Sequence, residues 1–344
     1  MAPDLHAGRA PQPEKLTGTG FTVKNACNAF LSWQAAKLEA GEIGGRWFED
    51  CRCILKEFAQ GVGKHRTVLD LCPADFQRYR SRLTKRLGVY ALRRHITAIK
   101  SVFKYAYDMG LVEQPMRFGR GFDPPSAAQQ RKAKQKAELT NGKKLFTRDE
   151  MIRILDSCTD GVLRAAILLG INGGFGNTDC ATLPTQAVDL NGGIISYARP
   201  KTGVQRVLPV WRETVSALEA VLAHRPEPKH EEAERLVFLT STGRPLVRQN
   251  LKAIEDGSSK VSNIDKLGAD FNTLLNSLTI KRRGIGFYTL RHTFRTWADE
   301  THDQHAIHRI MGHAIPGMSG IYVEDISLQR LRQVVDHVHD VLWR

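Results

Sequence analysis

The sequence predicts a mainly α-helical protein of two domains, in which the second domain also carries a small β-sheet and is α+β in class. Three observations lead to this prediction. Apolar residues recur at helical spacing over most of the chain, residues 192–210 alternate like a pair of strands, and a basic segment containing prolines separates the two regions. With 344 residues, 42% of them hydrophobic, the chain is long enough to build two cores.

The first domain is expected to be all α-helical and to cover residues 21–112, after a mobile tail at residues 1–20 that is rich in Pro, Gly and Thr. Four apolar stripes predict four helices, the third of which has Pro73 near its first turn. The stripes consist of Phe21, Ala26, Phe30 and Trp33; Trp47, Ile54, Leu55 and Phe58; Phe76, Tyr79 and Leu83; and Leu92, Ile96, Ile99, Phe103 and Tyr107. Gly110 is placed to end the fourth helix.

Residues 113–145 are expected to form a basic interdomain linker, because they contain prolines and a charged run, RKAKQKAELTNGKK, without an apolar face. The second domain, residues 146–344, opens on a capping box, Thr147 to Glu150, and continues into a very apolar helix over residues 162–171. Residues 192–210 predict a β-hairpin with Lys201 at its turn.

Helical patterns resume in the rest of the second domain, at residues 211–224, around 261–278, and at 289–300, 304–311 and 327–344. The last of these helices carries an apolar stripe that includes Leu331 and Val335. We expect this stripe to be exposed and to need a partner surface that covers it.

Basic residues exceed acidic ones by 50 to 36, so the formal net charge is +14, and residues 1–140 carry +11 of it. A surplus of this size predicts an anionic partner, and a phosphate backbone is the obvious polyanion. The candidate contacts to such a backbone are the cations off the apolar stripe of the fourth helix and those of the linker. They are Arg93, Arg94, Lys100, Lys104, Arg131, Lys132 and Lys134. The alternative is a basic face that serves solubility.

The chain lacks an apolar run that could span a bilayer and lacks a signal-peptide pattern, so we expect an intracellular, cytoplasmic protein. Its six cysteines show no CxxC pair and are expected to be reduced and mostly buried. No metal-ligand cluster is evident at residues such as His302, His305 and His308, and we expect neither a metal nor another cofactor.

The most informative stretch is Tyr288 to Arg295 (YTLRHTFR), which is followed by Gly312, His313 and then Tyr322. Arg291 lies beside an apolar ridge, and a guanidinium in that position can present two parallel donors to a phosphate. The other interpretation of Arg291 is an ion pair with Asp299 or Glu300.

The order and spacing of LRHTF, GH and a following tyrosine resemble the C-terminal signature of the tyrosine recombinases, the phage integrase family. The resemblance extends over roughly residues 21–335 and includes a helical core-binding domain, a linker and a catalytic domain with a lysine-bearing hairpin. It implies a site-specific recombinase or integrase that serves a mobile element. Four protomers would assemble on two sites in double-stranded DNA, with the helical and catalytic domains on opposite faces of the duplex. The terminal helix around Leu331 and Val335 would dock on a neighbouring protomer.

The resemblance also implies a mechanism without metal or ATP, through a 3′-phosphotyrosine and a Holliday junction. Tyr322 would be the nucleophile and Lys201 the general acid. Arg291 and His313 would act as cationic donors to the phosphate, while His292 would support the site. Three of these residues also have a purely structural interpretation. Lys201 could be an exposed turn residue, His313 could cap a helix end, and Tyr322 could pack in a loop between two helices.

Two positions depart from the family pattern. Gly176 stands where the family has a second arginine, and Tyr288 stands where it usually has a histidine, the usual candidate for accepting the nucleophile's proton. Because of this position, Tyr288 is included among the candidate catalytic residues. Losing one phosphate-binding donor costs on the order of 10²–10³ in rate by analogy with oxyanion-hole deletions. A cation from elsewhere could fill the space above Gly176, and Arg164, Arg199 and Arg206 are the candidates.

Three other functions stay open at this point. A catalytically silent DNA-binding protein of the same fold would explain Gly176. A type IB topoisomerase shares the phosphotyrosine chemistry, although the small helical domain and the terminal helix argue against it. A metabolic enzyme with a basic surface lacks support, because the sequence shows neither a dinucleotide fingerprint nor a P-loop.

Overall fold

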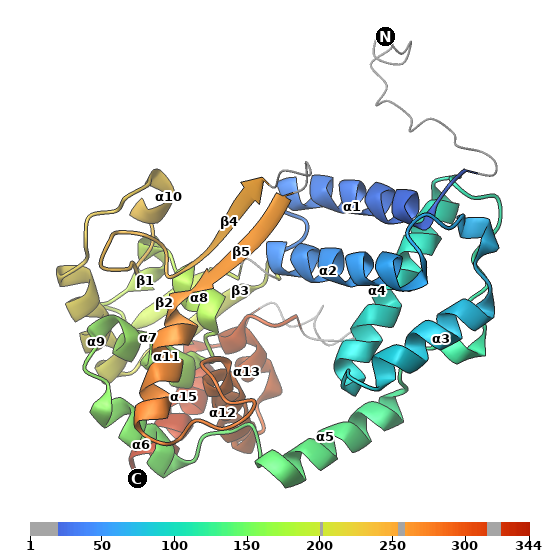
Figure 1. Ribbon diagram of the computed structural model, residues 1–344. Coiled ribbons are helices and arrows are strands. Elements are labelled where there is room, and N and C mark those ends of the chain that lie inside the picture. The colour runs from blue at the N-terminus through green and yellow to red at the C-terminus, as the bar shows by residue number, and fades with distance from the viewer. Residues whose placement is uncertain (1–19, 200–201, 254–258, 315–324) are drawn as a thin grey trace. The chain divides into compact units, whose positions relative to one another are not determined.

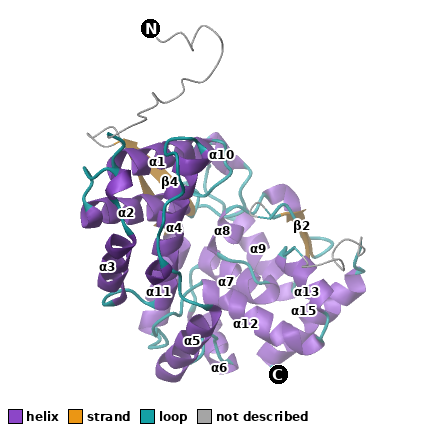
Figure 2. Cartoon of the chain, turned by 90° about the vertical axis from the view of Figure 1, so that its right-hand side faces the viewer, coloured by secondary structure: helices purple, strands orange, loops and turns teal. Residues whose placement is uncertain are grey.

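The computed structural model describes residues 20–199, 202–253, 259–314 and 325–344. The chain divides into two compact units, one of residues 1–137 and 251–261 and one of residues 138–250 and 262–344. Most of the described structure is helical, with a small antiparallel sheet, as the sequence predicts (Figures 1 and 2). None of the described helices combines the length and the apolar character needed to cross a membrane.

The first unit contains the four expected helices, α1 (Val23–Glu39), α2 (Gly45–Val62), α3 (Pro73–Thr84) and α4 (Val89–Asp108), and two short 3-10 turns, η2 (Val68–Asp70) and η3 (Arg120–Phe122). Helices α1 and α2 lie side by side and both contact α4 (Figure 1). Pro73 occupies the first turn of α3, and Gly110 has a φ of +67° just beyond α4, both as predicted.

Aromatic rings form the centre of this unit's core. Phe58, Phe76 and Phe103 are fully buried and meet edge to face or stacked, with ring centroids 5.7 to 6.2 Å apart. Phe118 and Phe122 add to the same cluster from the segment after α4. The segment expected to be a linker therefore contributes to this core. Its later part forms a helix, α5 (Ala127–Asn141), none of whose residues is buried.

The second unit is built around α7 (Gly161–Gly173), which is buried on nearly all sides. Helices α9 (Arg212–Ala223) and α12 (Tyr288–Ala298) pack directly on it. A Cβ at Gly170 would lie 2.7 Å from the Leu290 side chain, and one at Gly173 would lie 2.4 Å from Leu208, so glycine permits both close contacts. The predicted capping box of Thr147 and Glu150 opens α6 (Arg148–Ser157).

The sheet of this unit has the strand order β1 (Val188–Asp189), β2 (Ile194–Ala198) and β3 (Gln205–Pro209), all antiparallel. Strands β2 and β3 form the predicted hairpin, with Tyr197 opposite Arg206. The other short elements are α8 (Asn177–Ala181), η4 (Thr185–Ala187), α10 (Glu231–Glu234) and η5 (Asp299–Thr301).

Two expectations about the second half of the chain are wrong. The helical pattern expected around residues 261–278 begins only at Lys266, because Ser259–Asp265 is strand β5, which pairs with β4 (Val247–Ala253) and is followed by α11 (Lys266–Ser277). The apolar stripe of the terminal helix α15 (Leu328–Trp343) is buried within its own unit, where α15 contacts α7, α12 and α13 (Gln304–Met311). Leu331 and Val335 are each 1% exposed, so this stripe is not available to dock on a neighbouring copy.

The cysteines follow the sequence prediction for the most part. All six are unpaired, and Cys27, Cys51, Cys158 and Cys180 are buried, whereas Cys53 and Cys72 are exposed. Burial raises the pKa of Cys51 and of Cys158 to about 11 each, so these buried thiols stay protonated at neutral pH.

Candidate active site

The site begins at the glycine-rich turn that joins α7 to α8. Gly174 ends α7 in the left-handed region, at a φ of +64°, where a side chain would be strained. Gly176 then precedes α8, and its N–H donates to Oδ2 of Asp179 at 2.9 Å. This contact turns the Asp179 carboxylate back toward the glycine turn and away from solvent.

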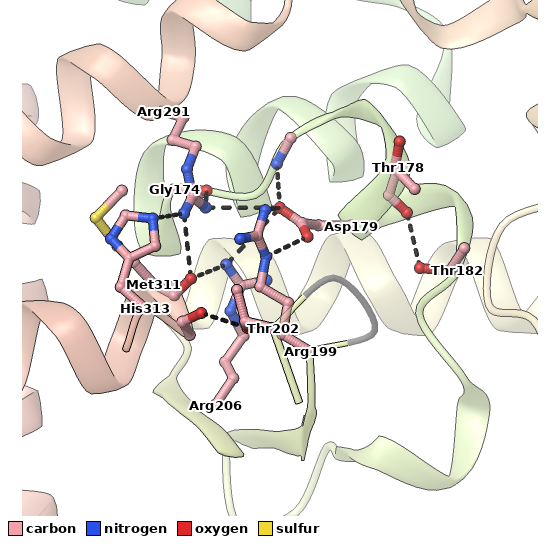
Figure 3. A network of polar contacts seen from close by, with 12 residues as sticks. Gly174, Thr178, Asp179, Thr182, Arg199, Thr202, Arg206, Arg291, Met311 and His313 are labelled. Atoms are coloured by element: carbon pink, nitrogen blue, oxygen red, sulfur yellow. Dashed lines mark hydrogen bonds and ion pairs between the residues drawn. The ribbon is translucent and has the colours of Figure 1, made fainter. Parts of the chain in front are cut away.

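Asp179 is the anchor of a buried cluster of three arginines (Figure 3). Arg199 donates to both carboxylate oxygens, from Nε at 2.8 Å and from Nη2 at 3.2 Å. Arg291 and Arg206 approach the same carboxylate, at 3.5 Å and 3.9 Å. Burial alone would raise the pKa of Asp179, but the hydrogen bonds from Arg199 and the charge of Arg206 lower it below the usual value. The three guanidinium groups and one carboxylate therefore leave a net charge of +2.

Arg291 is held by backbone carbonyls rather than by the acidic residues next to it in sequence. It is 3% exposed, and its guanidinium donates to the carbonyl oxygens of Gly174 and Met311. Burial and the charge of Arg199 lower the pKa of Arg291 to about 10, so it stays cationic at neutral pH. The alternative of an ion pair with Asp299 or Glu300 is wrong for the described contacts. Asp299 pairs with Arg295 and Glu300 with His337.

His313 lies next to Arg291, and its Nε2 is hydrogen-bonded to Nη2 of that guanidinium. Burial and the charges of Arg291 and Arg199 lower the pKa of His313 to about 4. The imidazole is therefore neutral at neutral pH, and its Nε2 accepts a hydrogen bond from Nη2 of Arg291. This neutral state differs from the cationic His313 that the resemblance implies, because the surroundings of His313 already hold three guanidinium groups.

Two of the three candidates for the space above Gly176 reach the cluster. Arg199 follows β2 and is 8% exposed, and Arg206 lies on β3 and is fully buried. The Arg206 guanidinium lies 3.9 Å from the centre of the Phe175 ring. Arg164, the third candidate, donates to the carbonyl oxygen of Leu155 and has no contact with Asp179.

Tyr288 occupies the space next to Gly176. A Cβ added at Gly176 would lie 3.3 Å from the Tyr288 ring, and Tyr288 itself is 52% exposed. The His292 ring meets Tyr288 edge to face, at 5.3 Å between ring centres. Both rings line a surface cavity of about 400 Å³, so His292 stands on the exposed side of α12 rather than behind the site.

Lys201 and Tyr322, the expected general acid and nucleophile, lie outside the described residues. Of the described residues on either side of Lys201, one belongs to the cluster and the other contacts the residue before His313. Arg199 binds Asp179, and Thr202 donates from its hydroxyl to the carbonyl oxygen of Gly312 at 2.9 Å. The described part of the chain holds no group of three His, Cys, Asp or Glu side chains that could bind a metal.

Most of the expected DNA contacts of α4 are already paired with carboxylates. Arg94 pairs with Asp50 at 2.5 Å, Lys100 with Asp123 at 2.9 Å and Lys104 with Asp108 at 2.8 Å. Their local charge is therefore partly compensated, which reduces what they offer to a phosphate. The other predicted contacts, Arg93, Arg131, Lys132 and Lys134, are exposed.

Asp179 is the residue that the sequence prediction missed. Its signal was present, since an acidic side chain three residues after a helix-opening glycine is placed to accept that residue's N–H. Its arginine partners lie 20, 27 and 112 residues further along the chain, a separation that no local pattern can bridge.

Comparison with known proteins gives a family match over more than half of the chain. Residues 144–327 match the model of the phage integrase family. The chain is 24% identical over 268 residues to the tyrosine recombinase XerD of Mycobacterium tuberculosis H37Rv, which covers 74% of this chain and 76% of that protein. XerD of Mycobacterium leprae is 25% identical over 271 residues, with 74% and 75% coverage.

Two solved structures share the fold. The Tn1549 transposon integrase in complex with transposon right end DNA has a TM-score of 0.61 at 14% identity, covering 91% of this chain and 98% of that one. A lambda integrase dimer bound to a COC′ core site has a TM-score of 0.61 at 12% identity, with 90% and 81% coverage.

Proposed function

The chain belongs to the phage integrase family, and from this membership we propose that it is an active site-specific recombinase that cuts and rejoins DNA through Tyr322. The observation that carries the proposal is the buried cluster of Arg291, Arg199, Arg206, Asp179 and His313. Its net charge of +2 and its fixed donors suit a phosphodiester that gains negative charge in the transition state.

The cleavage step is a transesterification. The phenolic oxygen of Tyr322 attacks the scissile phosphorus, a P–O bond to tyrosine forms, and the bond to the 5′-oxygen breaks. The leaving oxygen takes a proton from Lys201 and becomes a 5′-hydroxyl, while the phosphotyrosine stays on the 3′ end. The phenol, with an ordinary pKa of about 10, gives its proton to solvent or a nearby base, a transfer that the positive cluster favours.

Arg291 and His313 have different roles in this step. Arg291 carries full charge and offers donors to the non-bridging oxygens. His313 is neutral at physiological pH, so it contributes by holding the Arg291 guanidinium in place and by any hydrogen bond of its remaining ring nitrogen.

Rejoining reverses the chemistry with a 5′-hydroxyl from a second duplex. We propose that two such exchanges, separated by a Holliday junction, complete recombination in an assembly of four protomers on two sites, as the family resemblance implies. The XerD relatives are named as tyrosine recombinases, and the solved Tn1549 and lambda integrases are bound to DNA, which supports the same assignment of substrate.

Gly176 supports a second candidate, a DNA-binding protein of this fold without cleavage activity. The family pattern places an arginine there, and glycine offers no donor from a side chain. A protein of this kind would bind its site as tightly as an active enzyme and would form no covalent intermediate.

Covalent capture on a nicked duplex separates the two candidates. A binding site is first selected from a random duplex pool and then nicked beside the cleavage position, so that the freed short strand diffuses away and the phosphotyrosine accumulates. We expect a protein–DNA adduct in denaturing gels, lost in Tyr322→Phe and retained in Tyr107→Phe, an exposed tyrosine of α4. Tight binding without an adduct, over a nick scanned through the site, would favour the silent protein.

A further inference from the structure

We propose that Arg199 is the second phosphate-binding arginine of this site, supplying the guanidinium that Gly176 lacks. The proposal rests on the recombinase function proposed above and adds a residue to its active site. It is carried by the position of Arg199 relative to Gly176, Asp179 and His313.

Three distances link Arg199 to position 176 through one carboxylate oxygen of Asp179. The Gly176 N–H donates to Oδ2 of Asp179 at 2.9 Å, and a Cβ at Gly176 would lie 3.5 Å from the same oxygen. Nη2 of Arg199 donates to that oxygen at 3.2 Å. One carboxylate oxygen therefore lies between position 176, which has no side chain, and the Arg199 guanidinium.

Arg199 also lies beside the other phosphate-binding residues (Figure 3). A Cβ at Gly312, the residue before His313, would lie 3.0 Å from the Arg199 side chain. Nη2 of Arg199 and Nη1 of Arg291 approach the same oxygen, Oδ2 of Asp179, at 3.2 Å and 3.5 Å. Arg199, Arg291 and His313 thus share one side of Asp179.

The Arg199 side chain is fixed and still has a donor to offer. Its backbone N–H binds the carbonyl oxygen of Val204 at 2.9 Å, which anchors it where β2 ends, and Nε and Nη2 are held by Asp179. Within the described part of the chain, Nη1 has no hydrogen-bond partner. A guanidinium oriented in this way is preorganised for an incoming anion.

Arg206 does not fit this role. Its side chain is completely buried, lies over the Phe175 ring and donates to the carbonyl oxygen of Met311 at 3.1 Å. DNA cannot reach a side chain with no exposed surface, so Arg206 supports the cluster from inside. Arg199, at 10% side-chain exposure, lies at the edge where a phosphate can approach.

The charge balance of the cluster points to an anionic ligand. One carboxylate faces three guanidinium groups, and a buried excess of positive charge is costly when nothing compensates it. A phosphodiester adds one negative charge, and its two non-bridging oxygens can accept from Arg291 and Arg199 together.

The direct test measures single-turnover adduct formation on the nicked duplex. Arg199→Ala should form the adduct about 10²–10³-fold more slowly than the unaltered protein, with duplex affinity changed by less than about 10-fold. Arg199→Lys should recover part of the rate, since lysine keeps the charge and loses the fork. Gln205→Ala, on the exposed face of the adjoining strand, is the matched control and should react at the normal rate. Circular dichroism verifies that each variant is folded.

Two rescue experiments separate phosphate binding from support of the fold. A methylphosphonate at the scissile position removes the negative charge that Arg199 would meet, so the deficit of Arg199→Ala should shrink to less than about 10-fold on that substrate. Gly176→Arg added to Arg199→Ala should also restore rate, because the backbone at residue 176 is ordinary and the exposed Tyr288 ring can move aside. Loss of packing at Arg199 would be corrected by neither change.

The outcomes are distinct for the two proposals. If the unaltered protein forms the adduct and Arg199→Ala matches Gln205→Ala, the Arg199 proposal is overturned while the recombinase function stands. If the unaltered protein forms no adduct, the recombinase function fails, and inorganic phosphate becomes the probe of Arg199. Broadening of the ³¹P phosphate signal that is lost in Arg199→Ala supports an anion site at this residue, and equal broadening in both proteins overturns it.

Discussion

Replacing Asp179 by asparagine should unfold the second unit more readily than any other single exchange of a carboxylate among the described residues. The change keeps the shape of the side chain and removes its charge. Three guanidinium groups, with side chains between 0% and 10% exposed, then lose the only anion within 4 Å in the described structure. Removing one partner of a buried ion pair costs about 3–5 kcal/mol because the remaining charge stays buried.

This cost is large compared with the total stability of a domain, which is about 5–15 kcal/mol. For a unit of this size, about 3–5 kcal/mol corresponds to a fall in Tm of roughly 6–20 °C. Urea unfolding followed by tryptophan fluorescence and circular dichroism measures the loss, and Trp211, buried in the second unit, provides a local signal.

Asp75 offers a matched control in the first unit. It is buried as Asp179 is, and it pairs with Arg66 at 2.9 Å and Arg78 at 2.6 Å. The side chains of these two arginines are 38% and 74% exposed, so water can solvate them when the carboxylate is gone. We therefore expect Asp75→Asn to cost clearly less. Equal losses for the two variants would refute the view that buried arginines depend on Asp179 for charge compensation.

Three further predictions use the same structure. The pKa of His313 is about 4 in the folded protein against an ordinary 6.5, so between these pH values the unfolded chain binds one more proton than the folded chain. The free energy of unfolding therefore falls as the pH is lowered from 6.5 to 4. His313→Gln should reduce the slope of unfolding free energy against pH by up to about 1.4 kcal/mol per pH unit, measured by urea unfolding at a series of pH values. Gly173→Ala should cost about 1–3 kcal/mol by collision with Leu208, whereas Gly161→Ala, with open space around it, should be neutral or stabilising by thermal melts. Leu331→Ala should cost about 2–5 kcal/mol in a protein that stays monomeric in sedimentation, and dissociation of an oligomer on this change would contradict the packing of α15 within its own unit.

The helices could be predicted from the sequence because their signals are local. The stripe of α4, the proline of α3 and the capping box of Thr147 all act within a few residues, and each recurs in the structure. The β4–β5 pair escaped prediction because VRQNLKA and SKVSNID lack a regular apolar alternation. Such strands are defined by their pairing with each other, which a single sequence does not display.

The terminal helix shows a different limit. Its apolar stripe was identified correctly from spacing, and the structure places the stripe against α7, α12 and α13 of the same unit. Helical periodicity predicts that an apolar face is buried, but it does not show whether the face packs against the same chain or against another copy. The grouping of Arg199 and Arg206 around Asp179 has the same origin, since it depends on how the β2–β3 hairpin packs beside α8.

The cost of the arginine cluster bears on the choice between an active and a silent protein. Binding of a DNA backbone needs only exposed cations, such as Arg93 on α4 and Arg131 and Lys132 on α5. Burying Arg206 and nearly burying Arg199 and Arg291 around one carboxylate adds little to affinity and consumes folding free energy. This loss of folding stability is compensated in an enzyme, because donors that are fixed before charge develops on the phosphate lower the reaction barrier without reorganising during the reaction. The missing side chain at Gly176 is therefore better explained by a replacement donor on the β2–β3 hairpin than by loss of the donor. A slower cleavage rate with unchanged DNA affinity in Arg199→Ala is the result that decides between an active enzyme with a replaced donor and a silent DNA-binding protein.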